Sequence, residues 1–165
     1  MTLTYVGLTM TEIERKFLVT SEDFKIQSHK QTRIIQGFLN TNPERTVRVR
    51  LNGDKGFLTV KGKSTSDGLS RFEWEKEISK ADAEALLELC EKGVIDKIRY
   101  DINVGQHLFE VDVFSEDNIG LTIAEVELIH EDDIFEKPEW LGKEVTGDIR
   151  YYNSQLSLKP FHTWK

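Results

Sequence analysis

Glu12, Glu14 and Lys16 occupy every second position near the start of the chain. This two-residue period is that of a β-strand, and it puts the three charged side chains on one face, opposite Ile13 and Phe17. Two carboxylates on one strand face can share a divalent cation, with substrate phosphates as further oxygen ligands. The same pattern also fits a half-buried strand whose charged face meets only water. This stretch alone leaves both interpretations open.

Charged residues recur with the same period farther along the chain, opposite apolar faces. Arg48 and Arg50, for example, alternate with Val47 and Val49. The other charged faces carry Lys61, Glu75, Lys97, Arg99, Asp101, Glu110, Asp112, Glu125 and Glu127. Such a mixture of acids and cations suits a site for a polyanion with a divalent metal, because each ligand neutralises groups of the opposite sign.

These faces belong to about eight predicted strands, which alternation and turn residues place at 12–19, 31–40, 45–51, 57–61, 71–78, 95–102, 108–114 and 121–129. The predicted helices are a short turn after Ser21, a helix from its cap at Ser79 through Leu89, and a terminal helix from Asp148 to Leu158. The acidic tail that begins at Glu131 carries no predicted strand.

The chain has 165 residues, a formal charge of -7 and one cysteine, Cys90. Its length fits a single domain, expected over residues 10–165, and residues 1–9 read as a leader or start-site extension. The acidic balance argues against a general nucleic-acid or membrane-surface binder, which needs an excess of cations. A single cysteine cannot form an internal disulfide, and no apolar run is long enough to span a bilayer. We therefore expect a cytoplasmic protein without nucleic-acid or membrane partners.

Two architectures accommodate strands that have one apolar and one charged face. In an open antiparallel sheet, the apolar face packs on helices, the charged face is solvated, and no function is implied. In a closed barrel of inverted polarity, the charged faces line a central tunnel and the apolar faces meet peripheral helices. Periodicity alone does not decide between them.

Several motifs resemble, in the same order, those of one family, the CYTH superfamily of triphosphate tunnel metalloenzymes. Glu12-x-Glu14-x-Lys16 is similar to its ExExK signature. The supporting matches are Arg48-x-Arg50, Thr59-Val60-Lys61, Arg71-x-Glu73-x-Glu75, Lys97-Ile98-Arg99-Tyr100, Glu110-Val111-Asp112, Glu125-Val126-Glu127 and Asp148-Ile149-Arg150-Tyr151. The resemblance spans most of Met10 to Lys159. It implies an α+β fold built on a closed eight-stranded antiparallel β-barrel with peripheral helices, a bound triphosphate and a divalent metal.

The resemblance also implies roles for the charged residues. The phosphate-binding cations would be Lys16, Arg48, Arg50, Lys61, Arg99 and Arg150. The ligands for Mg²⁺ or Mn²⁺ would come from Glu12, Glu14, Glu75, Asp112, Glu125 and Glu127, with Glu73, Glu77, Asp101 and Glu110 as weaker candidates. Lys97 would either help to activate the attacking water, which requires a lowered pKa, or bind phosphate directly.

The activity implied by the resemblance is that of a short bacterial inorganic triphosphatase-like member, which hydrolyses tripolyphosphate to pyrophosphate and phosphate. The alternatives are class IV adenylate cyclase or thiamine triphosphatase activity, and a non-catalytic sensor of triphosphate or polyphosphate. The resemblance is also compatible with a homodimer. One residue departs from the family pattern: Phe38 stands where many short bacterial members have Tyr, so a hydroxyl that could orient substrate or water is missing.

Overall fold

The computed structural model describes residues 11–164, so the predicted leader at residues 1–9 lies outside the described part of the chain. Within this range the strands are β1 (Thr11–Val19), β2 (Lys30–Asn40), β3 (Arg45–Asn52), β4 (Lys55–Gly62), β5 (Ser70–Ile78), β6 (Ile95–Val104), β7 (His107–Phe114), β8 (Thr122–Glu127) and β9 (Leu141–Glu144). All eight predicted strands are confirmed, with small shifts at their ends. β9 was not predicted, because four residues are too few for alternation to be seen.

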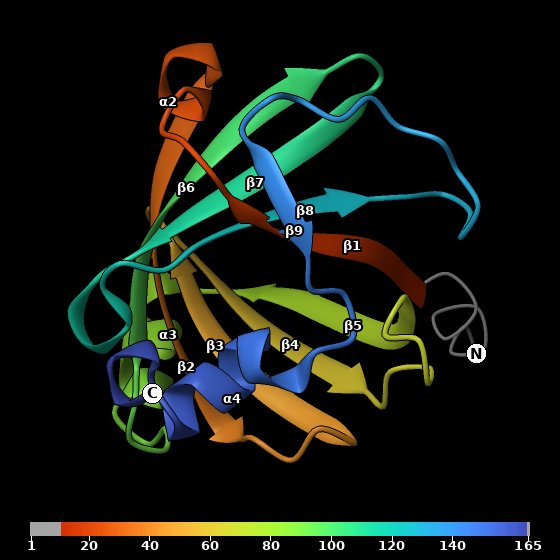
Figure 1. Cartoon of the computed structure of the whole chain (residues 1–165). Helices are drawn as coiled ribbons and strands as arrows, with labels where there is room; N and C mark the ends of the chain where they lie inside the picture. The colour runs from red at the N-terminus through yellow and green to blue at the C-terminus, as the bar shows by residue number, and fades with distance from the viewer. Residues whose placement is uncertain (1–10, 165) are drawn as a thin grey trace.

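The sheet closes on itself. Its strands lie in the order β5-β4-β3-β2-β6-β7-β8-β1, and β5 pairs again with β1, so that eight antiparallel strands form a barrel (Figure 1). β1 pairs with β5 only as far as Ile13, opposite Ser70. Beyond this point β9 pairs with β1 instead, at Phe17 and Val19. This confirms the closed barrel over the open sheet.

The described helices are α2 (Phe24–Gln27), α3 (Lys80–Leu87) and α4 (Asn153–Leu158), with 3-10 turns at Glu116–Asn118, Ile149–Tyr151 and Phe161–Thr163. The cap predicted at Ser79 is confirmed, because its side chain accepts a hydrogen bond from the Asp82 backbone N–H. α2 and α4 lie near opposite ends of the barrel (Figure 1). No helix among residues 11–164 is long and apolar enough to cross a membrane.

The continuous terminal helix predicted from Asp148 to Leu158 is wrong. Tyr152 is extended, with φ -71° and ψ 135°, and it separates the 3-10 turn Ile149–Tyr151 from α4. The Tyr152 ring lies 5.1 Å from Lys16 Nζ and 5.3 Å from the Arg71 guanidinium carbon. These contacts with two cations favour the extended conformation over local helix propensity.

The apolar core lies outside the barrel. One cluster of buried residues includes Phe17, Phe109, Val111, Val126 and Trp140, from β1, β7, β8 and the segment that follows β8. A second cluster lies beneath α4 and the C-terminal turns. Because alternate residues of a strand point to opposite faces, burying these side chains outside turns the charged residues of the same strands inward.

Two glycines bring the β4–β5 loop against the loop that follows β9. Gly68 has φ 77° and Gly147 has φ 82°, a region that residues with a side chain rarely adopt. A Cβ atom on Gly68 would lie 2.2 Å from the Gly147 Cα. This contact requires glycine, and it closes the wall where β5 and β1 have separated.

Candidate active site

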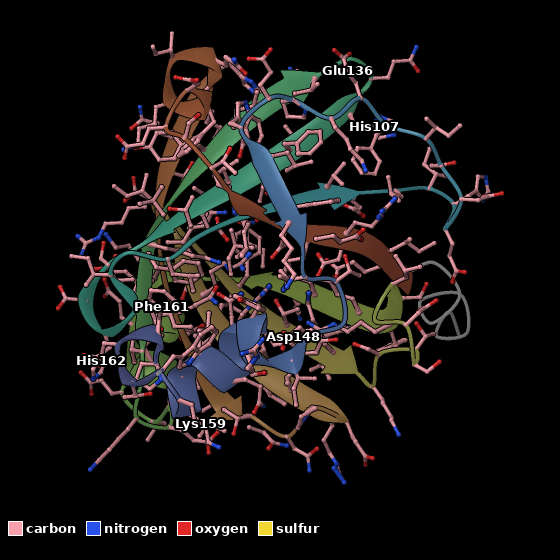
Figure 2. All side chains as sticks on the ribbon, in the orientation of Figure 1. His107, Glu136, Asp148, Lys159, Phe161 and His162 are labelled. Atoms are coloured by element: carbon pink, nitrogen blue, oxygen red, sulfur yellow. The ribbon has the colours of Figure 1, made fainter. Side chains whose placement is uncertain are left out.

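A cavity of about 250 Å³ occupies the inside of the barrel. Six cations line it: Lys16, Arg48, Arg50, Lys61, Arg71 and Arg99. Seven carboxylates line it as well: Glu12, Glu14, Glu73, Glu75, Glu110, Glu125 and Glu127. Figure 2 shows nitrogen and oxygen atoms crowded into the space that the strands enclose. Strand alternation therefore brings together most of the residues predicted from the sequence.

Several cations in the cavity are paired with carboxylates. Lys61 Nζ lies 2.7 Å from a Glu12 oxygen, and Lys16 Nζ lies 3.6 Å from Glu125. Arg48 donates a hydrogen bond to the Thr59 hydroxyl, which in turn donates to Glu75 at 2.7 Å. These pairs neutralise part of the charge on each side chain, which lowers the cost of burying it.

Arg50 and Arg71 differ from these cations. Among residues 11–164, neither guanidinium has an ion-pair partner. Within the same part of the chain, Arg71 Nη1 and Arg48 Nε are buried without a hydrogen-bond partner. Burial, together with Arg48 and Arg99, lowers the pKa of Arg50 to about 9. Buried donors without partners are costly, so this wall of the cavity is suited to an anion.

The carboxylates of β1 and β8 crowd one another across the same cavity. Burial, and then the neighbouring Glu125 and Glu12, raise the pKa of Glu14 to about 8. Burial acts in the same direction on Glu125, but Lys16 and Arg99 outweigh it and hold the pKa of Glu125 well below its usual range. A divalent cation would relieve this crowding, and carboxylate oxygens are the ligands that Mg²⁺ and Mn²⁺ prefer.

The carboxylate oxygens are therefore ligands of the right chemical type for a hard divalent cation. Among residues 11–164, however, no three carboxylates yet converge on one point. Glu12 is held by Lys61 and Glu125 by Lys16, both within 4.0 Å. Binding a metal would require these carboxylates to leave their lysines.

Lys97 and Asp112 lie beneath the cavity wall rather than on it. Lys97 Nζ lies 2.7 Å from Asp112, and the two Asp112 oxygens accept hydrogen bonds of 2.7 and 2.8 Å from Arg99. Both side chains are almost completely buried, and neither lines the cavity. In this arrangement the Asp112 oxygens are held by two cations, and its role as a metal ligand stays a prediction.

The role predicted for Lys97 is also affected by this placement. Burial lowers its pKa to about 7, with contributions from Arg99 and Arg50, while Asp112 acts in the opposite direction. The amine is nevertheless fully buried, and it donates a second hydrogen bond to Asn153 Oδ1 at 3.0 Å. Lys97 thus has the lowered pKa that activation of water needs, but not the access to the cavity.

Arg150 does not lie among the cations that line the cavity, and its role in phosphate binding stays a prediction. Its guanidinium is exposed, and it pairs with Asp148 at 2.6 Å. It also lies against the rings of Tyr151 and Trp164. Figure 2 labels Asp148 where the chain passes from β9 towards α4. The extended Tyr152 takes the inward position that the sequence suggested for Arg150.

Several residues that line the cavity were not among the predicted site residues. Arg71 shares a strand face with Glu73 and Glu75, so alternation could have selected it. Tyr152, Asn153 and Ser154 come from an irregular segment and its helix, where no period marks the inward residues. Thr46 and Asn52 of β3 also line the cavity, as does Phe38, whose ring replaces the tyrosine frequent in the family.

Comparisons with known proteins show the family of this chain. The profile of the CYTH domain family matches residues 10–155, and the chain belongs to that family. An inorganic triphosphatase of Acetivibrio thermocellus is 47% identical over 155 residues, which cover 93% of this chain and 97% of that protein. An inorganic triphosphatase of Nitrosomonas europaea is 40% identical over 155 residues, covering 90% and 98%. The resemblance to the family is therefore confirmed.

A solved structure supports the same conclusion for the fold. The crystal structure of an inorganic triphosphatase superimposes with a TM-score of 0.64 at 34% identity, covering 89% of this chain and 94% of that one. The triphosphate tunnel metalloenzymes of this family depend on a divalent metal.

Proposed function

We propose that this protein is an inorganic triphosphatase, which hydrolyses tripolyphosphate to pyrophosphate and phosphate with Mg²⁺ or Mn²⁺. The observation that carries the proposal is a cavity inside the barrel lined by six cations and seven carboxylates, in which the guanidiniums of Arg50 and Arg71 have no described ion-pair partner. Two relatives named inorganic triphosphatase, each matched over nearly its whole length, support it. The free thiol of Cys90 is consistent with a cytoplasmic location.

The charges in the cavity indicate that a triphosphate and a divalent cation bind together. Six cations and seven carboxylates leave the lining close to neutral. A triphosphate alone would therefore add uncompensated negative charge, and a divalent cation alone would compete with the lysines for the carboxylates. Both ligands together satisfy both sets of side chains, because phosphate attracts the cations and metal attracts the acids.

The side chains divide into two groups by chemistry. We propose that phosphate oxygens are held by Lys16, Arg48, Arg50, Lys61, Arg71 and Arg99. We propose that the metal ligands come from Glu12, Glu14, Glu75, Glu125 and Glu127. A bound divalent metal supplies charge neutralisation and a more acidic water. The chain itself positions the terminal phosphate for in-line attack and stabilises the charge that develops on its oxygens.

Release of phosphate from a panel of substrates tests this function. Tripolyphosphate, ATP and thiamine triphosphate are each incubated with Mg²⁺, Mn²⁺ or EDTA. We expect release from tripolyphosphate that depends on metal. Glu125→Gln should reduce it strongly, and Glu84→Gln, on the exposed face of α3, should leave it unchanged. Release from none of the three would refute the triphosphatase and, if tripolyphosphate still binds, would support the sensor instead.

A further inference from the structure

Arg50 is held by an amide and not by a carboxylate. Its Nε donates a hydrogen bond of 2.9 Å to Gln36 Oε1, across the pairing between β2 and β3. Gln36 is fully buried. By contrast, Arg99 is fixed by two carboxylates, Asp112 and Glu110. The orientation of Arg50 is therefore set without neutralising its charge.

Gln36 is itself fixed by a second amide. Gln36 Nε2 donates to Asn153 Oδ1 at 2.8 Å, and the same oxygen accepts from Lys97 Nζ at 3.0 Å. Lysine and arginine side chains only donate, so Asn153 must present its oxygen to Lys97 and Gln36 must present its oxygen to Arg50. Only one orientation of each amide satisfies both ends. The relay runs Lys97 to Asn153 to Gln36 to Arg50, and it contains no acid.

We propose that Gln36 and Asn153 are positioning residues for triphosphate binding, which act through Arg50. Their amides fix the guanidinium so that its remaining N–H groups face the cavity, and they leave its full positive charge available for phosphate. The inference rests on the proposed function, because it concerns how the triphosphate is held. It also assigns Lys97 a role as the fixed donor at the far end of the relay.

The relay links the C-terminal helix to the barrel. Asn153 is the first residue of α4, directly after the extended Tyr152, whereas Gln36 and Arg50 belong to β2 and β3. The orientation of Arg50 therefore depends on the placement of α4. The contribution of α4 is an amide, because the helix contains no charged residue.

A double-mutant cycle on tripolyphosphate binding tests the inference. Affinity is measured by titration calorimetry with Ca²⁺ in place of Mg²⁺, for the wild type, Gln36→Met, Arg50→Met and the double variant. We expect the Kd to rise about 10-fold for Gln36→Met and about 100-fold for Arg50→Met, because hydrogen bonds and charge contacts of this kind contribute on that scale. The double variant should bind no worse than Arg50→Met, since Gln36 acts through Arg50.

The control is Gln31→Met, the same substitution at an exposed position of the same strand, which should leave the Kd unchanged. Gln36→Glu provides a second variant if Gln36→Met fails to fold. It keeps an acceptor for Arg50 but adds a negative charge and loses the N–H donor to Asn153 Oδ1, so tripolyphosphate binding should weaken. A wild-type Kd in Gln36→Met or Gln36→Glu, or additive effects in the double variant, overturns the inference. Failure of the wild type to bind tripolyphosphate would instead overturn the proposed function.

Discussion

Replacement of Asp112 is the substitution whose effect on stability follows most directly from the structure. Its side chain is 1% exposed, and its two oxygens accept hydrogen bonds from Lys97 and Arg99. Asp112→Asn keeps the size of the side chain but replaces one acceptor oxygen with an NH₂ group that faces a cationic donor. Arg99 then loses one of the two carboxylates that hold its guanidinium, and Lys97 loses the group that raises its pKa.

The expected cost follows from this burial. Removing one partner of a buried ion pair costs about 3–5 kcal/mol, because an uncompensated charge stays inside the protein. In a domain of this size, 1 kcal/mol lowers the Tm by roughly 2–4 °C. Asp112→Asn should therefore lower the Tm by roughly 6–20 °C, which thermal unfolding followed by circular dichroism at pH 7 measures.

Asp96→Asn provides the matched control, since Asp96 lies in the same strand as Lys97 and pairs with Arg33 at 2.6 Å in an exposed position. It should change the Tm only slightly, because exposed pairs are screened by water. Equal shifts for the two variants would refute the buried pair as a source of stability. A normal Tm for Asp112→Asn together with loss of metal dependence would support Asp112 as a metal ligand.

Three further predictions concern the cavity and its surroundings. In EDTA the Tm should fall from pH 5 to 8, because folded Glu14, with a pKa of about 8, keeps a proton that the unfolded chain has released; Glu14→Gln should reduce this slope. Gly68→Ala should lower the Tm more than Gly105→Ala, since both have positive φ but only Gly68 also meets backbone at 2.2 Å. Arg150→Ala should keep the wild-type Kd for tripolyphosphate in the calorimetric titration, while Arg50→Ala should raise it about 100-fold.

The sequence predicted the strands and the faces of the barrel well, because alternation is a local property. Glu12 and Glu14 on β1, and Arg48 and Arg50 on β3, point inward as their period indicates. The pairing of β1 with β5 joins segments far apart in the chain, and no local pattern contains it. The family resemblance, and not periodicity, supplied the closed barrel.

Alternation could not predict which inward-facing residues of a strand line the cavity and which are buried beneath it. Lys97 and Arg99 share one face of β6, yet Arg99 lines the cavity and Lys97 does not; the Lys97 amine donates to Asn153 and lies 5.3 Å from the centre of the Phe114 ring. The two-residue period shows which face of a strand a side chain lies on, but not which other segments of the chain pack against that side chain. Arg150 lies outside the cavity for a different reason: a break at Tyr152 reverses which side chains of the terminal segment face inward, and such breaks depend on tertiary contacts.

A crystal structure with Mn²⁺ and a non-hydrolysable imido analogue of tripolyphosphate tests most directly whether this cavity is the triphosphate site. Anomalous scattering locates the metal independently of the phosphates. We predict phosphate oxygens within hydrogen-bond distance of Arg48 and Arg50, and Mn²⁺ bound by carboxylates of β1 and β8, among them Glu14 and Glu125. An analogue bound outside the barrel, or Mn²⁺ held away from these carboxylates, would contradict the assignment.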